Sequence, residues 1–238
     1  MSLKKVFQRK ETKYLLNQTQ FSSFFEELQA HMSVDQYGLH TIRSLYYDTA
    51  DYRFIRHSMD KPIYKEKFRI RSYGTPRPDS VIFLEIKKKI KGIVYKRRLP
   101  ISYETYLFWQ HTGALPENID QSQIGQEIAW LFFKHPDLSP KVLISYDRFS
   151  LFSEVEEDFR VTFDQNIRYQ DRKLNLDAAR GAFVAPELDV LMEVKAMGAY
   201  PLWFVGLLTK YHIQKGNFSK YAQTYQRHLF KEELFHVI

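Results

Sequence analysis

The chain of 238 residues contains no cysteine. This absence excludes disulfide bridges, thiolate zinc sites and a cysteine nucleophile. The sequence also has no P-loop of the pattern G-x-x-x-x-G-K-[ST] and no glycine-rich dinucleotide fingerprint, so neither device would cradle a phosphate. Its eight histidines are scattered without a pair at metal-ligand spacing, which argues against a histidine-built metal site. A Ser/His/Asp catalytic set finds no support either.

Long apolar runs are also absent. The longest stretch without charge, residues 196–209, is too short to cross a bilayer and predicts a buried helix. Residues 1–7 lack the apolar run of a signal peptide. We therefore expect a soluble, cytoplasmic protein.

What the sequence does have is a moderate excess of positive charge. Thirty-five Lys and Arg residues face 28 Asp and Glu residues, a formal net charge of +7. Hydrophobic residues make up 44% and aromatic residues 16%, which excludes disorder, collagen and coiled coil. No internal repeat, Gly/Ser linker or change in composition divides the chain, so we predict one domain over residues 1–238. The net charge favours anionic partners without identifying them.

Apolar periodicity and turn residues predict few helices and many strands. The predicted helices are 19–32, 122–135, 201–211 and a last one that begins at Lys220. The predicted strands are 7–15, 40–47, 64–73, 81–89, 93–99, 142–149, 159–164 and 188–195. Because these strands follow one another without helical crossovers, we predict an α+β fold with an antiparallel sheet or barrel.

Seven of the eight predicted strands, all but 40–47, have one charged series and one largely apolar series at alternate positions. Residues i and i+2 of a strand share a face, so the charged side chains gather on one side. The bases of that face outnumber its acids by three to one. The bases are Arg9, Lys13, Lys67, Arg69, Arg71, Lys87, Lys89, Lys96, Arg98, Arg148, Arg160 and Lys195, and the acids are Glu11, Glu85, Asp164 and Glu193.

Two interpretations of this face are open. The first is a sheet with one face on the core and the other in water. It fits less well, because like charges on neighbouring strands repel. The second, which we favour, closes the sheet around a lumen that holds a polyanion, with a few carboxylates for Mg²⁺ or Mn²⁺. Phosphoryl transfer is compatible with such a site, since it needs mainly alignment and charge neutralisation.

A series of short motifs, taken in order, resembles a known family. The motifs are RKETKY at 9–14, YYDT at 46–49, RIR at 69–71, LEIK at 84–87, YKRR at 95–98, YDR at 146–148, RVTFD at 160–164, MEVK at 192–195 and FSKY at 218–221. Together they resemble the VTC domain, the catalytic domain of the vacuolar transporter chaperone polyphosphate polymerase. That domain belongs to the triphosphate tunnel metalloenzymes, or CYTH-like superfamily.

The resemblance implies an eight-stranded antiparallel β-barrel tunnel with flanking helices. In such enzymes the terminal phosphate of ATP passes to a growing polyphosphate chain with Mn²⁺ or Mg²⁺. The implied catalytic phosphate ligands are Lys13, Arg69, Arg71, Lys87, Lys96, Arg98, Arg148, Arg160 and Lys220. The implied cofactor-binding residues are Lys13, Arg69, Arg71 and Lys195. The implied metal ligand is Glu193, with Glu11 or Glu85 assisting.

Lys220 is also predicted to bind an anion for a reason that does not depend on the resemblance. It follows Ser219, a good N-cap at a helix start, where backbone N–H groups favour an anion.

Two differences between this chain and proteins of the family that it resembles bear on the activity. Relatives in the thiamine-triphosphatase and class IV cyclase branch open with E-x-E-x-K, whereas Arg9 stands at the first of these Glu positions. Fewer carboxylates favour the polymerase branch over a triphosphatase. The chain also lacks the membrane helices and the inositol-phosphate sensing domain found with the eukaryotic polymerase, so it does not support translocation or that mode of regulation.

Alternative functions stay open at this point. An inorganic triphosphatase or polyphosphate hydrolase would use the same face, and so would a non-catalytic polyphosphate- or nucleotide-binding module. A nucleic-acid-binding barrel is disfavoured, because the aromatic residues lie mostly on the opposite face or in helices. The expected ligands are ATP, triphosphate and polyphosphate, without nucleic acid. A separately encoded membrane-protein partner and the oligomeric state are left open.

Some residues near these motifs have simpler interpretations. We expect packing roles for Tyr46 and Tyr47, since aromatic residues favour strands. Asp48 is a candidate turn former. Lys88 and Arg97 alternate with the charged series, so we assign them to the opposite face and to the surface.

Overall fold

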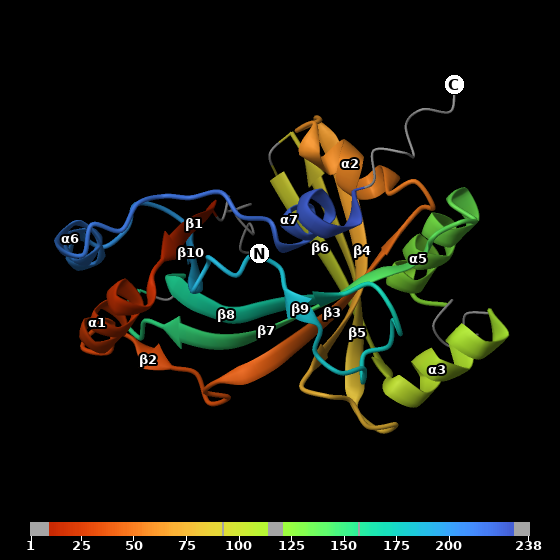
Figure 1. Cartoon of the computed structure of the whole chain (residues 1–238), viewed down its shortest axis with the longest axis horizontal. Helices are drawn as coiled ribbons and strands as arrows, with labels where there is room; N and C mark the ends of the chain where they lie inside the picture. The colour runs from red at the N-terminus through yellow and green to blue at the C-terminus, as the bar shows by residue number, and fades with distance from the viewer. Residues whose placement is uncertain (1–9, 92, 114–120, 157, 231–238) are drawn as a thin grey trace, which may run out of the picture. The chain divides into compact units, whose positions relative to one another are not determined.

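The computed structural model describes residues 10–91, 93–113, 121–156 and 158–230 (Figure 1). The strands of this part are β1 (Lys10–Leu16), β2 (Ser33–Val34), β3 (His40–Asp48), β4 (Tyr64–Tyr73), β5 (Val81–Ile90), β6 (Ile93–Ser102), β7 (Ser139–Phe152), β8 (Arg160–Gln170), β9 (Ala182–Phe183) and β10 (Val190–Ala196). The helices are α1 (Gln18–Leu28), α2 (Arg53–Met59), α3 (Tyr103–Thr112), α5 (Gln123–Lys134), α6 (Leu202–Lys210) and α7 (Lys220–Thr224), which continues as the π-helix η1 (Tyr225–Leu229).

The chain divides into two compact units. The first unit comprises residues 1–40, 146–167 and 185–219, and the second comprises residues 41–145, 168–184 and 220–238. Strands β7 and β8 each contribute residues to both units. The single domain predicted from the sequence stays a prediction.

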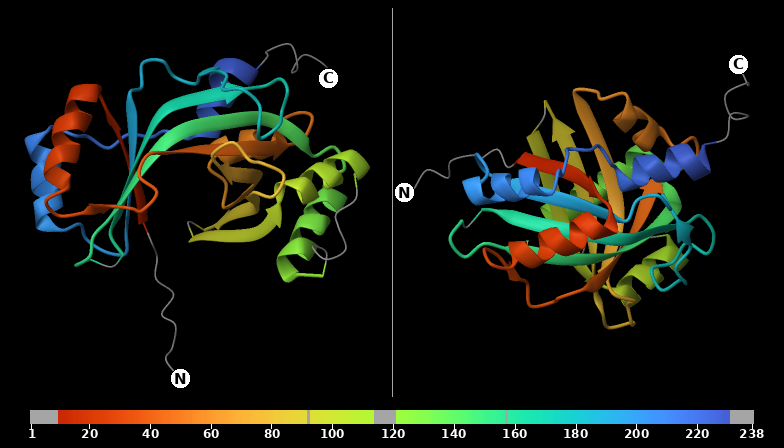
Figure 2. Two further views of the ribbon diagram at one scale, coloured as in Figure 1. Left: turned by 90° about the horizontal axis from the view of Figure 1, so that it is seen from below. Right: turned by 60° about the vertical axis from the view of Figure 1, so that its left-hand side comes forward.

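The first unit is an antiparallel sheet covered by two helices. Its strands lie in the order β1-β10-β8-β7, with β2 beside β7. Helices α1 and α6 lie side by side (Figure 2). They pack on the apolar face of the sheet, where the ring of Phe24 lies 5.7 Å from Phe204 and 6.3 Å from Phe163. Asn17 and Gln20 form a capping box that starts α1.

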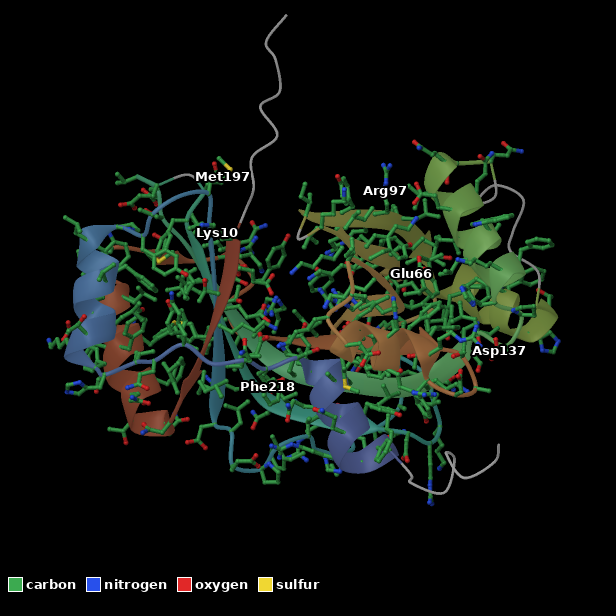
Figure 3. All side chains as sticks on the ribbon, turned by 90° about the horizontal axis from the view of Figure 1, so that it is seen from above. Lys10, Glu66, Arg97, Asp137, Met197 and Phe218 are labelled. Atoms are coloured by element: carbon green, nitrogen blue, oxygen red, sulfur yellow. The ribbon has the colours of Figure 1, made fainter. Side chains whose placement is uncertain are left out.

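The second unit is built on the antiparallel order β3-β4-β5-β6, with β9 beside the end of β8. Its core lies between one face of this sheet and the helices α3 and α5, where Tyr47 and Phe68 pack against Trp109 and Phe132. Glu127 of α5 forms ion pairs with Lys88 and Arg97 on this side of the sheet; Figure 3 labels Arg97. The opposite face is therefore left for the charged series.

The antiparallel α+β fold is confirmed, and each of the eight predicted strands is present. Strand β4 coincides with 64–73, and β6 and β8 run further than predicted, to Ser102 and Gln170. Positions 7–9 of the first predicted strand, including Arg9, lie outside the described residues. Within those residues the strand order of each unit is an open path, so closure into a barrel is not established by the pairing.

The helices show where periodicity succeeds and where it fails. Helix α5 lies within the predicted 122–135, with Ser122 as its N-cap. The helix predicted over 201–211 is confirmed as α6. The apolar stretch 196–209 does not form one buried helix along its whole length. Ala196 ends β10, α6 begins at Leu202, and Leu202 is 88% exposed because α6 packs only one face on the sheet. In the described parts of the chain, no helix has the length and apolar character needed to span a membrane.

Candidate functional site

The charged face of the second unit is organised by the register of three strands. Arg69 of β4 lies opposite Glu85 of β5, and Glu85 lies opposite Arg98 of β6. Lys87, two positions along β5, lies between Lys67 and Lys96. Directly opposed residues on one face are close enough for their side chains to meet. The register therefore brings the predicted residues Arg69, Arg71, Lys87, Lys96 and Arg98 onto one surface.

Glu85 is the centre of this surface, and only 1% of it is exposed. One carboxylate oxygen lies 2.7 Å from Nε of Arg69 and 3.9 Å from Nε of Arg71. The other accepts from Nε of Arg98 at 2.8 Å and lies 2.9 Å from Nζ of Lys96. Burial opposes ionisation, but the cations outweigh it and hold the pKa of Glu85 well below its usual range. We call Glu85 and these four cations the Glu85 cluster.

The Glu85 cluster carries more positive than negative charge, and this affects its own members. Burial lowers the pKa of Lys96 to about 8, with Arg69 and Arg71 contributing, although Glu85 opposes the shift. The guanidinium of Arg71 donates to Oγ of Ser44 at 3.2 Å. That of Arg98 donates to Oη of Tyr73 at 3.1 Å. These neutral partners help to fix the arginines in place without adding negative charge.

Tyr46 belongs to this face and was not predicted to. Its hydroxyl accepts a hydrogen bond from Nη1 of Arg69 at 2.9 Å. Burial opposes ionisation of the phenol, but Arg69, Arg71 and Lys67 together overcome it and lower the pKa of Tyr46 to about 8. The expectation that Tyr46 serves packing alone is incomplete, whereas Tyr47 does pack in the core as expected. Alternation of Tyr46 with Leu45 and Tyr47 was the signal that could have placed it on the charged face.

Tyr46 also links the charged face to the last helix. Its ring stacks on Tyr221 of α7 at 4.7 Å, and the hydroxyl of Tyr221 donates to Asp48 at 2.8 Å. The same carboxylate accepts from the backbone N–H groups of Phe54 and Ile55 at the start of α2. Asp48 is thus a buried helix-capping residue rather than a simple turn former. Lys220, buried at the first position of α7, precedes Tyr221.

The first unit carries a second charged face. Strand register places Lys13 opposite Glu193, Glu11 opposite Lys195, and Lys195 opposite Arg160. Nζ of Lys13 lies 3.3 Å from Oε1 of Glu193 and 3.9 Å from Oε1 of Glu11. It also donates to the carbonyl of Phe218 at 2.7 Å. Lys13 is therefore held by the loop that precedes α7 as well as by the sheet.

Arg148 occupies the centre of this second face. It forms a bidentate pair with the buried Asp164, and its Nη2 lies 3.4 Å from Oε2 of Glu193. Burial lowers the pKa of the neighbouring Lys195, and Arg148 contributes, while Glu193 opposes the shift. Arg160 instead pairs with the loop residue Asp35 at 3.5 Å, where its side chain is half exposed. Lys13, Arg148, Arg160 and Lys195 are thus collected on the face of one unit.

The carboxylates of this face suit a hard divalent cation. Mg²⁺ is usually bound by one or two carboxylates together with substrate phosphates. Glu193 has both oxygens directed at Lys13 and Arg148 at more than 3 Å, whereas Asp164 is fully engaged by Arg148. Among the residues described, no three or more His, Asp or Glu side chains are grouped to hold a metal by themselves. Glu193 thus fits a metal shared with phosphate, and Glu85, surrounded by cations, fits less well.

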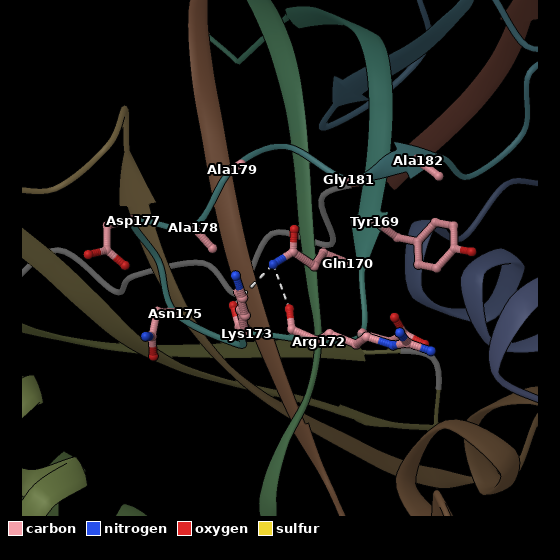
Figure 4. Close-up of a pocket in the computed structure, with 11 residues that line it drawn as sticks. Tyr169, Gln170, Arg172, Lys173, Asn175, Asp177, Ala178, Ala179, Gly181 and Ala182 are labelled. Carbon is pink, nitrogen blue, oxygen red and sulfur yellow. Dashed lines mark hydrogen bonds between the residues drawn. The ribbon is translucent and has the colours of Figure 1, made fainter.

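The second unit also has a surface hollow that does not involve the predicted site residues. It is formed by the loop between β8 and β9 (Figure 4), where Nε2 of Gln170 donates to the carbonyl of Lys173 at 3.1 Å. Its lining includes Arg172, Asn175 and Asp177 but no residue predicted for the site.

Comparison with solved structures defines the class of fold. A candidate adenylate cyclase from Bacillus halodurans superposes with a TM-score of 0.57 at 13% identity, covering 94% of this chain and 100% of the other. Another candidate adenylate cyclase, from Vibrio parahaemolyticus, gives a TM-score of 0.49 at 12% identity and covers 91% of this chain and 97% of the other. The chain therefore shares the fold of the Bacillus halodurans protein.

The family follows from the sequence match. Residues 8–229 match the family model of the VTC domain, and the chain belongs to this family. The resemblance of the motifs to the VTC domain is therefore confirmed. No curated protein matches the chain.

Proposed function

We propose that this protein is a polyphosphate polymerase-like phosphotransferase, which moves the γ-phosphate of ATP onto a polyphosphate chain with Mn²⁺ or Mg²⁺. The observation that carries the proposal is the Glu85 cluster. There a single buried carboxylate meets Arg69, Arg71, Lys96 and Arg98. Four cations on one anion leave a surplus of positive charge, and a triphosphate would offset it.

The residue types suit the chemistry of a transferred phosphoryl group. Arginine supplies planar, bidentate donors for phosphate oxygens, and lysine supplies a mobile point charge. In the transition state, charge spreads over the oxygens of the transferred group, so pre-positioned cations stabilise it. Arg69, Arg71 and Arg98 are each held by a second partner, which keeps their donors in place before substrate binds.

The eight-stranded tunnel and the metal are parts of the same proposal. Membership of the VTC family supports a tunnel into which the predicted phosphate ligands point. Glu193 would hold the divalent cation, which would neutralise phosphate charge when bound. Lys13 and Arg148, which now contact Glu193, would then be available to phosphate oxygens. We further propose that the protein acts in the cytoplasm on ATP and polyphosphate and not on nucleic acid.

The test is a polymerisation assay. Purified protein is incubated with ATP, Mn²⁺ and a pyrophosphate primer, and the products are separated on a polyphosphate gel. Chain growth is expected from the wild type. Glu193→Gln should abolish turnover while retaining much of the binding of tripolyphosphate. Glu127→Gln is the matched control, since Glu127 pairs with Lys88 and Arg97 on the helix-covered side.

Other outcomes would replace the proposal. ADP formation without chain product would identify a triphosphatase or polyphosphate hydrolase. Tripolyphosphate binding without any nucleotide turnover would identify a non-catalytic binding module.

A further inference from the structure

The charged face of the second unit ends in aromatic side chains next to the turn between β4 and β5. Along β4, the charged series Arg69 and Arg71 continues with Tyr73. Along β5, Phe83 lies two positions before Glu85 and on the same side of the strand. The rings of Tyr73 and Phe83 lie 5.8 Å apart in an edge-to-face arrangement. The face therefore changes from charged to aromatic at this end.

Arg98 contacts both parts of this face. Its Nε donates to the carboxylate of Glu85 at 2.8 Å. Its guanidinium carbon lies 4.4 Å from the centre of the Phe83 ring, and its Nη2 donates to Oη of Tyr73 at 3.1 Å. A cation near the face of an aromatic ring is attracted by the electrons of the ring. One arginine therefore joins the Glu85 cluster to the aromatic end of the face.

The ring of Tyr73 is open to a ligand. Tyr73 is 47% exposed, whereas Tyr47 and Phe68 are buried in the core on the helix-covered side of the same sheet. A single exposed aromatic residue is ordinary on a protein surface and needs no explanation by itself. Tyr73 differs in its position, because its hydroxyl contacts an arginine of the Glu85 cluster. A ring exposed beside cations offers a surface on which a planar base can stack.

We propose that Tyr73 is the platform for the adenine base of ATP when the phosphates of ATP lie at the Glu85 cluster. This inference rests on the proposed function and adds a nucleoside subsite to it. Tyr73 lies four residues from Arg69 along β4, or about 13 Å at roughly 3.3 Å per residue. This separation suits an extended nucleoside triphosphate, whose base and terminal phosphate lie at opposite ends of the molecule.

The distribution of rings favours one base over a strand of nucleic acid. Proteins that hold single-stranded nucleic acid stack successive bases on several aromatic side chains. Further along this face, positions 65, 67, 69 and 71 of β4 and 85, 87 and 89 of β5 are all Lys, Arg or Glu. The rings of β4 and β5 on this face are thus confined to the end at Tyr73 and Phe83, as a mononucleotide requires.

The experiment separates the contribution of the base from that of the phosphates. Calorimetry measures the affinities for ATP and for tripolyphosphate, with a metal chelator present so that neither is turned over. Tyr73→Leu removes the ring and the hydroxyl, whereas Tyr73→Phe removes only the hydroxyl bond to Arg98. Thermal melts establish that each variant is folded. If Tyr73→Leu does not fold, Tyr73→Thr takes its place, since threonine favours strands.

The matched control is Tyr95→Leu. Tyr95 is 49% exposed, nearly as much as Tyr73, and belongs to the same sheet. It alternates with Lys96 along β6, so it lies on the opposite side of the strand. The control therefore removes an equally exposed ring from the other face.

In Tyr73→Leu, the ratio of the affinity for ATP to that for tripolyphosphate should fall about tenfold relative to the wild type. This is toward the lower end of what stacking one base on an aromatic ring contributes. In Tyr73→Phe and in the control, the ratio should stay within about twofold. Both Tyr73 variants should bind tripolyphosphate somewhat more weakly, because Arg98 loses its hydroxyl partner in each.

Each contrary result has a separate meaning. If both ligands bind and Tyr73→Leu keeps the ratio of the wild type, the base does not stack on Tyr73 and the proposed function is unaffected. If the ratio falls equally in Tyr73→Phe, the hydroxyl acts on the base instead of the ring, and the platform is overturned. A control that loses the ratio as strongly as Tyr73→Leu would also overturn it. If neither ligand binds the wild type, the proposed function fails and this inference fails with it.

Discussion

Arg148 and Asp164 form a bidentate ion pair on the charged face of the first unit, with Nε 2.5 Å from Oδ1 and Nη2 2.7 Å from Oδ2. Asp164 is fully buried, so its charge depends on this partner. The pair fixes the plane of the Arg148 guanidinium. Its Nη2 then lies 3.4 Å from Oε2 of Glu193. We therefore expect Asp164 to affect phosphate binding through Arg148.

Replacing Asp164 by Asn should destabilise the protein. Removing one partner of a buried pair leaves the other charge uncompensated and costs about 3–5 kcal/mol. We expect a loss near the lower end of that range, since Glu193 still faces Arg148. Urea denaturation of both proteins gives the difference in the free energy of unfolding. Asp35→Asn, which breaks the exposed pair with Arg160, should cost less than about 1 kcal/mol; equal losses would contradict this assignment.

Glu85→Gln should make the folded protein more dependent on anions. Without the carboxylate, four cations lose their internal counter-charge, so the melting temperature should fall. Tripolyphosphate should then restore more stability in the variant than in the wild type, because it binds the folded form and supplies the missing charge. Thermal melts with and without tripolyphosphate, in the absence of metal, measure this. If tripolyphosphate raises the melting temperature of the variant no more than that of the wild type, Glu85 does not act as the internal counter-ion.

Tyr46 should titrate near pH 8. A phenol whose folded pKa is below its unfolded value of about 10 adds stability above that unfolded value. The contribution is lost as the pH falls through 8. Absorbance of the phenolate should show one tyrosine with a midpoint near 8 in the wild type and none in Tyr46→Phe. The stability advantage of the wild type over the variant should grow from pH 7 to pH 10; a constant difference would exclude an ionising Tyr46.

Tripolyphosphate affinity should fall as Lys96 loses its proton near pH 8. Lys96→Arg keeps its charge throughout this range, so its affinity should fall less between pH 7 and pH 9. Between pH 7 and pH 9, the ratio of the variant's affinity for tripolyphosphate to that of the wild type should grow by about fivefold, the effect of one nearby charge. Ionisation of the ligand is the same for both proteins and cancels in this comparison. Parallel pH profiles would show that Lys96 is not a phosphate ligand.

Two helices escaped prediction for different physical reasons. Helix α3 has aromatic residues around much of its circumference, so no single apolar face stands out; Ser102 as N-cap and Gly113 after the last turn were its signals. Helix α2 begins where Asp48 accepts from the backbone of Phe54 and Ile55, six and seven residues further along the chain. A cap at that separation has no local pattern.

The sequence predicted which charged side chains share a strand face, but not which of them contact one another. Lys88 and Arg97 lie on the side assigned to them, because alternation along a strand depends only on backbone geometry. That the same face includes Tyr46 was overlooked, and the roles of the predicted ligands remain predictions. Which acid meets which base could not be predicted, since pairing depends on residues far apart in the chain.

The order of residues alone was enough to separate a cationic strand face from an apolar one, because a period of two places every second side chain on the same side. Folding decided that Glu85 would be shared by Arg69 and Arg98 and that Asp164 would pair with Arg148. It also decided that Lys65 would face Lys89. These relationships are set by strand register, and register is fixed by cross-strand hydrogen bonds and by the packing of the opposite face, neither of which is local in the chain.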